Sequence, residues 1–459
     1  MQEVYEKFLS ESESKAFNLA HRKTIAFNIS RYDASVKKGK LQYSNLDLAK
    51  KRAGIIKHKV LENLENYLKE FDLNISSRGV KVIWALDAIE ARKAVVEILE
   101  KHHVKLVVKS KSMITEEIGL VECLEKNGIE AIETDLGEYI VQISNDRPYH
   151  IVTPVMHRSA KDVAEIFNQK FGLPIDSTPE EITAFVREKL RDKFLKAGAG
   201  ISGANFIIAD PGAVGLTENE GNGVMSTTFP EVHIAIAGIE KMIPTLNDLD
   251  LFWPLLSTHG TGQKVTAYNS IFTGPRQKGE ANGPRFMYVI LLDNGRSNVL
   301  AQIPQRRALS CIRCGACLNG CPIYRNIGGH AYGTVYSGPI GSVITPHLQG
   351  MEIYKHLSYA SSLCGKCSEV CPVGIDLHSQ LLNNRNYSVV NNLVPSIEKR
   401  GMKIWKIAMK NRWMLDLPPS NVKNFFVKKL FGKTWGKRRT LPVVSKKTFG
   451  KLWKELSEK

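Results

Sequence analysis

Seven of the eight cysteines lie in two short runs in the final third of the chain. The first run has the spacing C-x2-C-x2-C-x3-C-P, with thiols at Cys311, Cys314, Cys317 and Cys321. In bacterial ferredoxins, a run with this spacing wraps three thiolates around one iron–sulfur cluster and sends the fourth to a second cluster. The short gaps turn the backbone tightly, so three sulfurs can reach the corners of one cubane. The run therefore predicts iron–sulfur chemistry.

The second run matches the same template, except that Ser361 stands where the first cysteine would be. The crossed ligation of the template assigns four thiolates to one [4Fe–4S] cluster, namely Cys311, Cys314, Cys317 and Cys371. It leaves three thiolates for the second cluster, namely Cys321, Cys364 and Cys367. That cluster is either a [3Fe–4S] centre or a [4Fe–4S] centre whose fourth iron takes Ser361, water, a partner's group or a histidine. The nearby histidines are His330, His347, His356 and His378.

Zinc is the competing interpretation of the cysteine runs, because pairs of the form C-x2-C also suit tetrahedral zinc. A closed zinc site needs four ligands, so seven cysteines in these two runs fit a pair of zinc sites poorly. We expect the eighth cysteine, Cys123, to pack on a helix face as a small apolar residue.

The elements that must position these residues follow from the hydrophobic pattern. Residues 1–70 predict a helical arm, with Leu61, Leu64 and Leu68 spaced for one buried face. In residues 71–300, apolar strand patterns alternate with helical patterns, which predicts an α/β domain with a parallel sheet. The strand candidates are VKVIW, VKLVVK, IEAIET, YHIVT, NFIIAD, VHIAIA and FMYVILL. Residues 301–395 predict a small all-α ferredoxin-like domain, because the stretch between the runs is longer than a compact ferredoxin needs.

A loop rich in glycine and polar residues follows the NFIIAD strand candidate. Such loops at strand ends commonly bind small ligands, and a tight structural turn is the alternative. The loop contains neither G-x-G-x-x-G nor a P-loop motif, so it predicts no dinucleotide or nucleotide site of those kinds. The candidate binding residues are Asp210, Thr217, Glu218, Asn219, Glu220 and Asn222.

The net charge of +17 is concentrated at the end of the chain. Residues 400–459 alone carry a net charge of +14, and Trp405, Trp413, Trp435 and Trp453 lie in the tail 396–459. Such a tail can bind an anionic membrane surface, which would bring the clusters near a quinone-linked acceptor, or it can dock an acidic partner or remain solvated. No motif indicates nucleic acid. The absence of a secretory signal and of a long apolar stretch predicts a cytoplasmic protein, at the inner face of the membrane if the tail binds lipid.

Several segments resemble one known family. They are LVVKSKSMITEEIGL (106–120), ETDLGEYIVQ (133–142), HIVTPVMHRS (150–159), ADPGAVGLTENEGNG (209–223) and both cysteine runs. Together they resemble the lactate utilization protein B family, in which a LUD domain precedes a two-cluster ferredoxin-type domain. The resemblance implies an α/β fold similar to ribose-phosphate isomerases and CoA-transferases. It also implies electron transfer in the oxidation of L-lactate to pyruvate, with sister proteins A and C. The serine in the second run is the family's arrangement, and no catalytic residue of the LUD loop can be transferred.

Two functions are compatible with these features. Lactate oxidation removes two electrons, whereas iron–sulfur clusters pass one at a time, so a two-cluster chain is a relay whose hydride-removing step needs another cofactor or subunit. We therefore expect an electron-transfer subunit of a lactate-oxidising complex. The alternative is a self-contained organic-acid oxidoreductase that binds its substrate at the LUD loop. The sequence leaves open whether the chain is an enzyme by itself. Arg313 and Lys366 lie inside the cysteine runs, where positive charge favours the reduced clusters.

Overall fold

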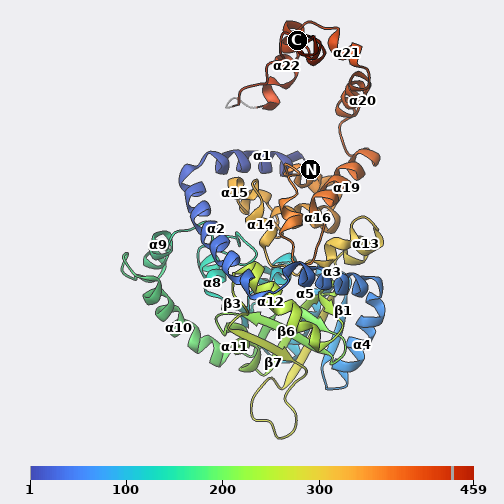
Figure 1. The fold of residues 1–459 in the computed structure, drawn as a ribbon. Helices are drawn as coiled ribbons and strands as arrows, with labels where there is room; N and C mark the ends of the chain where they lie inside the picture. Colours follow the sequence, from blue (N-terminus) through green and yellow to red (C-terminus); the bar gives the residue numbers. More distant parts are fainter. Residues whose placement is uncertain (1, 436–438, 459) are drawn as a thin grey trace. The chain divides into compact units, whose positions relative to one another are not determined.

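The computed structural model describes residues 2–435 and 439–458. The chain divides into two compact units, residues 1–386 and residues 387–459, and each unit is described by itself. The first unit combines an α/β part, built on a parallel sheet, with a helical part that carries the cysteine runs (Figure 1). The fold class predicted from the sequence is confirmed.

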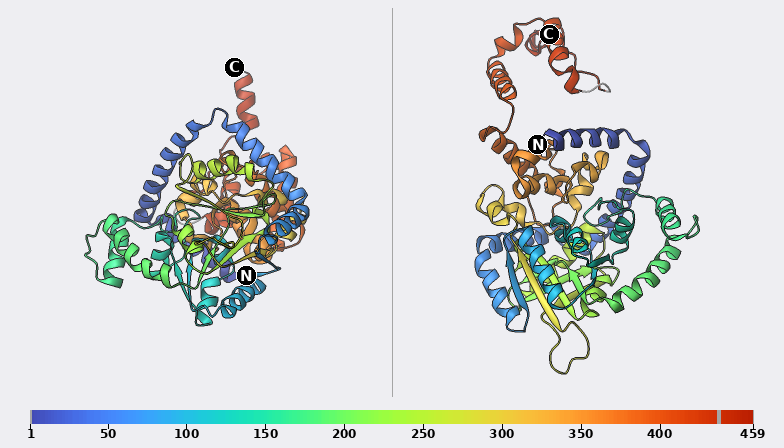
Figure 2. Two further views of the ribbon diagram at one scale, coloured as in Figure 1. Left: turned by 90° about the horizontal axis from the view of Figure 1, so that it is seen from below. Right: turned by 180° about the vertical axis from the view of Figure 1, so that it is seen from behind.

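The central sheet has six parallel strands in the order β1-β10-β7-β4-β2-β3. Strands β7 and β10 read VHIAIAG and FMYVILL and are buried almost throughout, as expected for parallel strands covered on both faces. Figure 2 shows helices on both sides of this sheet. The strands are β1 (Lys81–Ala85), β2 (Leu106–Lys109), β3 (Glu130–Glu133), β4 (Ala199–Ser202), β7 (Val232–Gly238) and β10 (Phe286–Leu292).

A smaller sheet has four strands in the order β8-β5-β6-β9. The NFIIAD segment forms β5 here, paired antiparallel with β6, and is not a strand of the parallel sheet. The predicted strand YHIVT is wrong, because residues 149–153 form bends and irregular backbone. The strands are β5 (Phe206–Ile208), β6 (Ala213–Glu218), β8 (Met242–Ile243) and β9 (Tyr268–Phe272).

The helices of the α/β part cover the sheets with their apolar faces. For example, α5 buries Ala91, Val95, Ile98 and Leu99 in a core shared with β4, β7 and β10. These helices are α5 (Ala88–Lys101), α6 (Met113–Glu117), α7 (Leu120–Lys126), α8 (Leu136–Ile143), α9 (Ala160–Phe171), α10 (Pro179–Lys196), α11 (Asn222–Thr228) and α12 (Leu249–Gly260). Two short 3-10 turns, η2 (Ile239–Lys241) and η3 (Leu246–Asp248), also lie here.

Four helices precede the sheet, and they bind both parts of the first unit. Leu61, Leu64 and Leu68 are buried, as their spacing predicts. In α1, the ring of Phe8 lies 5.1 Å from that of His356 in the helical part. The helices are α1 (Gln2–Phe17), α2 (Leu19–Gly39), α3 (Leu46–Glu62) and α4 (Leu64–Ser76), with the 3-10 turn η1 (Lys40–Gln42) between α2 and α3.

The part that carries the cysteine runs consists of short helices joined by tight turns. It packs closely on the α/β part, since a Cβ added at Gly329 would lie 1.8 Å from the backbone oxygen of Tyr149. The helices are α13 (Arg296–Ala301), α14 (Ala316–Gly320), α15 (Tyr324–Ile327), α16 (Gly338–Gln349), α17 (Met351–Tyr354), α18 (Lys366–Glu369) and α19 (Leu377–Val390). The 3-10 turns are η4 (Arg306–Ser310), η5 (His330–Tyr332) and η6 (Lys355–Tyr359).

The second unit is a helical tail. In α20 the apolar side chains of Ile397, Ile404 and Ile407 are exposed. The helices that follow α19 are α20 (Ser396–Lys410), α21 (Arg412–Asp416), α22 (Ser420–Trp435) and α23 (Phe449–Ser457). Within the described residues of the chain, no helix has the length and apolar character needed to cross a bilayer.

Candidate functional site

Four cysteines from the two runs line one small cavity. Three of them are buried and Cys311 is partly exposed, and we call these four the internal group. This cavity has a volume of about 20 Å³, and its remaining walls are mostly apolar, with Ile151, Ile340 and Val373 among them. The cysteines are Cys311, Cys314, Cys317 and Cys371. The structure therefore brings together the four residues that crossed ligation assigns to the first cluster.

The other three cysteines of the runs form a separate group nearer the surface. Cys321 and Cys367 are buried, whereas Cys364 is exposed. Burial and the charge of Cys321 raise the pKa of Cys367 to about 11, and Cys364 contributes to the shifts of both buried thiols. A Cβ added at Gly320, next to Cys321, would lie 3.5 Å from the Cγ of Lys366, next to Cys367, so the segments that carry these thiols lie side by side.

The two runs share one backbone conformation. Arg313 and Leu363 each precede a run's second cysteine position and have positive φ angles of 62° and 56°. Gly315 and Gly365 follow that cysteine with φ angles of 77° and 80°, where a side chain would be strained. The matching turns explain why the sequences of the two runs resemble each other.

The same turn makes a similar hydrogen bond in each run. The amide N–H of Arg313 donates to the sulfur of Cys311 at 3.4 Å. In the second run, the amide N–H of Leu363 donates to the hydroxyl oxygen of Ser361 at 3.1 Å. The Ser361 hydroxyl therefore accepts the bond that the cysteine sulfur accepts in the first run.

The donor set around the inner cavity suits a metal centre with sulfur ligands. Burial and the charge of Cys311 raise the pKa of Cys314 and of Cys317, so four adjacent thiolates need a cation to stabilise them. The sulfur of Cys371 also accepts a hydrogen bond from the amide of Ile375 at 3.3 Å. Amide hydrogen bonds to ligand sulfurs are one of the means by which proteins tune iron–sulfur clusters.

A network of buried charges lies beside the first cysteine group. Arg296 donates to Glu240 at 2.6 Å and to both carboxylate oxygens of Glu117 at 2.9 and 2.8 Å. Arg313 reaches Glu240 at 3.4 Å, and its guanidinium lies 4.4 Å from the ring centre of Tyr336. Burial alone would raise the pKa of Glu240, but the charges of Arg296 and Arg313 outweigh it and lower this pKa to about 2.

Two lysines belong to the same network. The ammonium of Lys57 is buried and donates to the backbone oxygens of Glu240 and Met242. Burial lowers the pKa of Lys57 to about 7. Burial and the charge of Arg313 lower the pKa of Lys241 to about 8. The network therefore holds more basic than acidic side chains.

A larger cavity of about 520 Å³ lies between the α/β part and the first cysteine group. It lies where parallel strands end, since Ser110 and Lys111 follow β2, Gly203 follows β4, and Gly238 ends β7. Ligands of α/β proteins commonly bind at these carboxyl ends. Cys314 and Arg313 form part of the wall, so the cavity extends from the sheet to the cysteines.

The structure places most of the predicted loop residues on this larger cavity. Five of the six line it, namely Thr217, Glu218, Asn219, Glu220 and Asn222. Asp210 is not part of the lining, and its backbone instead pairs with Pro244 and Asn74. Sequence reasoning missed Lys111, Lys241 and Arg313 as residues of the wall. Lys111 lies in a family-like segment, whereas nothing in the sequence singles out Lys241.

Much of the polar character of this loop holds the loop itself together. Glu218 accepts the amides of Gly223 and Val224, at 2.6 and 2.8 Å. The side-chain amide of Asn219 pairs with that of Gln263 at 3.0 and 2.9 Å. These bonds match what a structural turn requires, so the loop's role in ligand binding stays a prediction.

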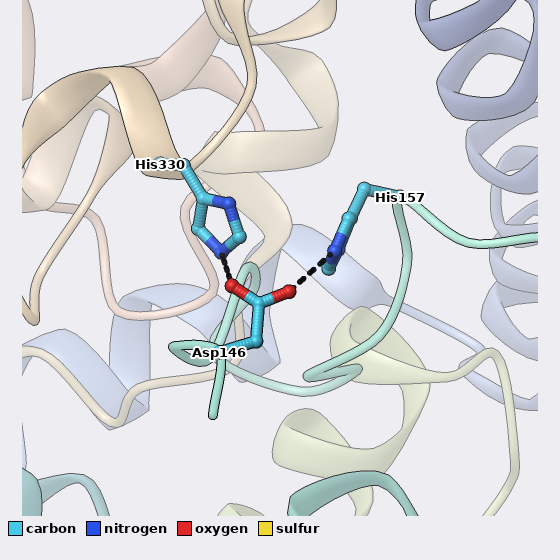
Figure 3. Close-up of side chains that lie close together, drawn as sticks. All are labelled: Asp146, His157 and His330. Carbon is cyan, nitrogen blue, oxygen red and sulfur yellow. Dashed lines mark hydrogen bonds and ion pairs between the residues drawn. The ribbon is translucent and has the colours of Figure 1, made fainter. Parts of the chain in front are cut away.

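A second polar cluster joins the α/β part to the cysteine-bearing part. Figure 3 shows Asp146 between His157 and His330, whose Nε2 atoms lie 3.2 and 3.7 Å from its carboxylate. Three such side chains can hold a metal ion. However, Arg158 already donates to Asp146 at 2.7 Å, and Nε2 of His330 lies 2.7 Å from the backbone oxygen of Arg147. The cluster is therefore explained as an ion-pair hub.

The histidines near the cysteine runs have other contacts as well. His347 lies 2.8 Å from the side-chain oxygen of Asn384, and His356 lies 3.1 Å from the backbone oxygen of Ile353. His378 lies 2.8 Å from the hydroxyl of Ser368, which is adjacent to Cys367. The fourth ligand of the second cluster stays a prediction.

Comparison with known proteins accounts for both parts of the first unit. Residues 68–292 match the LUD domain family, and residues 307–375 match the 4Fe-4S dicluster domain family. Lactate utilization protein B of Bacillus thuringiensis (strain Al Hakam) is 42% identical over 411 residues, which cover 87% of this chain and 86% of that protein. The same values hold for lactate utilization protein B of Bacillus anthracis (strain A0248).

The chain belongs to the lactate utilization protein B family. The resemblance stated from the sequence is thereby confirmed. The dicluster match favours iron–sulfur over zinc for the cysteine runs. A crystal structure of a DUF162 family protein from Deinococcus radiodurans is also similar, with 13% identity and a TM-score of 0.29, over 50% of this chain and 98% of that one.

Proposed function

We propose that this member of the lactate utilization protein B family is an electron-transfer subunit in the oxidation of L-lactate to pyruvate. The observation that carries the proposal is the pair of cysteine groups, one internal and one reaching the surface through Cys364. Electrons would enter at the internal group and leave at the exposed one, since one-electron transfer needs an exit close to an acceptor. The hydride-removing step would belong to another subunit or cofactor.

For the cofactors, we propose two clusters held as the crossed template assigns them. Cys311, Cys314, Cys317 and Cys371 would hold a [4Fe–4S] cluster, supported by the cavity that these four line. Cys321, Cys364 and Cys367 would hold the second cluster. The Ser361 hydroxyl is our candidate for its fourth ligand, because it accepts the amide bond that Cys311 accepts in the first run. A three-iron second cluster is the alternative.

The cofactor proposal is tested by anaerobic purification followed by metal and sulfide analysis and EPR. We expect iron and acid-labile sulfide, and EPR signals from two centres after reduction. Cys371→Ser should remove or alter one centre, whereas Cys123→Ser is the matched control, since Cys123 lies outside both groups. Zinc in place of iron would overturn the proposal.

A specific observation favours the second candidate function, a self-contained organic-acid oxidoreductase. The larger cavity is lined by both loop residues and Cys314, so a bound acid would lie beside the internal cysteine group. An L-lactate turnover assay with an artificial acceptor distinguishes the two functions. The relay proposal expects turnover to appear when sister subunits A and C are added. Robust turnover by the isolated chain would replace it with the second candidate.

We further propose a cytoplasmic location and an acceptor at the inner membrane face, reached through the basic tail. The support is a net charge of +14 over residues 400–459 and exposed apolar side chains such as Trp405 and Trp453. Basic helices with tryptophans bind anionic lipid surfaces. Full-length protein should sediment with vesicles containing phosphatidylserine, but not with phosphatidylcholine alone. Failure to sediment with either kind of vesicle would favour an acidic partner subunit.

A further inference from the structure

Lys57 of α3 is a buried lysine without a carboxylate partner. Only 1% of this residue is exposed, and its Nζ atom donates to the backbone oxygens of Glu240 at 2.6 Å and of Met242 at 2.9 Å. Among the described residues, no carboxylate lies within ion-pair distance of this Nζ atom. Burying a charged ammonium without a counter-charge is costly, so these surroundings favour the neutral amine.

The number of acceptors around Lys57 suits a change of protonation. A neutral amine has two N–H groups, which the two backbone oxygens accept, whereas an ammonium has three. Lys57 can therefore gain a proton without losing either hydrogen bond. Lys109 is the contrast in the same chain, because this equally buried lysine lies 2.6 Å from Glu133 and 3.6 Å from Glu116 and so stays charged. The charge of Lys57 depends instead on a negative charge that forms elsewhere.

Two hydrogen bonds and an ion pair connect Lys57 with the internal group of cysteines. Lys57 donates to the backbone of Glu240, whose carboxylate lies 3.4 Å from the Nη2 atom of Arg313. The amide N–H of Arg313 in turn donates to the sulfur of Cys311 at 3.4 Å. These surroundings are buried and screen charge weakly, so an electron added to a cluster on Cys311 changes the electrostatic potential at Lys57.

The helix that carries Lys57 also packs on the internal group. A Cβ added at Gly54, one turn before Lys57, would lie 2.8 Å from the backbone oxygen of Val373, which lines the small cavity of that group. The guanidinium of Arg307 in η4 donates to the backbone oxygen of Gly54 at 3.2 Å. Backbone contacts therefore fix the position of Lys57 beside the internal group.

The charged groups that act on Lys57 come from two segments. They are Glu240 and Lys241 of η2, and Arg313 and Cys311 of the first cysteine run. Glu240 stays ionised, because its two arginine partners outweigh the effect of burial and lower its pKa to about 2. On α12, which also packs on α3, burial lowers the pKa of His259 to about 4 and keeps it neutral. The buried residues of α4 and β8 are apolar. Lys241 is the competing proton acceptor, since burial and a neighbouring arginine lower its pKa to about 8.

We infer that Lys57 takes up a proton when the internal cluster is reduced. This inference rests on the proposed function, in which electrons enter at that cluster, and it names a further residue that the relay uses. In this step one electron is added to the cluster and one N–H bond forms at Nζ of Lys57, so the net charge of the buried region is unchanged. The electron comes from the lactate-oxidising step. The proton comes from water in the larger cavity, whose wall includes Glu240 and Lys241. Lys57 releases the proton again when the electron passes to the second cysteine group.

Anaerobic redox titrations of the full-length protein, followed by EPR at several pH values from about 6 to about 9, test this inference. The centre to follow is the one that Cys371→Ser removes or alters. Its midpoint potential should fall as pH rises above about 7, because the proton that accompanies the electron becomes scarcer. The slope should approach 59 mV per pH unit, which is a tenfold change in proton concentration converted for a one-electron couple.

Two variants of Lys57 separate its proton from its charge. Lys57→Met removes the proton acceptor and should make the midpoint potential independent of pH. Lys57→Arg carries a permanent charge and should also remove the pH dependence, but at a higher potential than Lys57→Met. Lys59→Met is the matched control, because it makes the same substitution at an exposed position of the same helix and should keep the slope.

The inference is overturned if the unchanged protein, with intact iron content and EPR signals, has a midpoint potential that does not vary with pH. This measurement needs no variant. The inference is also overturned if Lys57→Met keeps the pH dependence, and its loss in Lys241→Met would then assign the proton to Lys241. These failures leave the relay function standing. Absence of the clusters, or no electron transfer with the sister subunits, would instead count against the proposed function.

Discussion

Replacing Arg313 with glutamine should lower the reduction potential of the internal cluster. Only 9% of the Arg313 side chain is exposed, and its amide lies 3.4 Å from the sulfur of Cys311. The length of an arginine side chain keeps its charge within about 10 Å of that sulfur. At an effective dielectric constant of about 20, Coulomb's law gives about 1.7 kcal/mol for one electron at this distance. This energy corresponds to about 70 mV for a one-electron couple. The potential falls because the lost positive charge no longer stabilises the added electron.

Lys366→Gln provides the comparison, since this lysine lies in the second run but is 48% exposed and pairs with Glu369 at 2.7 Å. With water as the surrounding medium, the same distance gives about 0.4 kcal/mol, or about 20 mV, before salt screening. The assay is an anaerobic redox titration followed by EPR, with a thermal melt to show that each variant is folded. The reasoning fails if Arg313→Gln changes the midpoint potential of neither cluster by more than Lys366→Gln does. Burial would then not set the strength of the interaction between each side-chain charge and its cluster.

Three further predictions concern stability and the second cluster. Arg296→Met should lower the free energy of unfolding by about 3–5 kcal/mol, because among the described residues it leaves buried Glu117 without an ion-pair partner and Glu240 with Arg313 alone; a loss below about 1 kcal/mol in denaturant melts would contradict this. Ser361→Cys should give the second cluster a fourth thiolate and change its EPR spectrum, whereas an unchanged spectrum would remove Ser361 from the ligand position. Burial and then a neighbouring aspartate raise the pKa of Glu220 from 4.5 to about 7, so the stability that its protonated form contributes is lost as pH rises from about 4.5 through about 7. In thermal melts, the stability of Glu220→Gln relative to the unchanged protein should therefore be higher at pH 8 than at pH 5. A difference between the two proteins that is the same at both pH values would refute the raised pKa of Glu220.

The parallel strands were predictable because the apolar pattern that indicates them lies within each strand's own sequence. FMYVILL is apolar along its whole length and VHIAIAG is apolar apart from His233, which is typical of parallel strands covered on both faces. YHIVT has a similar local composition but forms no strand. Tyr149 and His150 are buried against the cysteine-bearing part, where Tyr324 donates to the backbone oxygen of Tyr149. This contact joins residues far apart in the chain. The local sequence pattern indicated that YHIVT is buried, but it could not show that a distant segment buries it instead of a neighbouring strand.

Part of the candidate site was likewise predictable from the sequence, and part of it depends on tertiary structure. The spacing of the cysteines by itself predicts two groups, because ligand spacing within a run depends on a few consecutive backbone angles. Tertiary structure decides that Cys364 is exposed, whereas three of the four cysteines of the other group are buried. It also decides that Lys241 and Arg313, 72 positions apart, share one cavity wall with the end of β7. A cavity depends on how several distant segments pack, and no single segment carries its signal. The sequence thus determined the family, most strands of the parallel sheet and the iron–sulfur character of the cysteine runs, while packing decided where charge, cavity and cysteines meet.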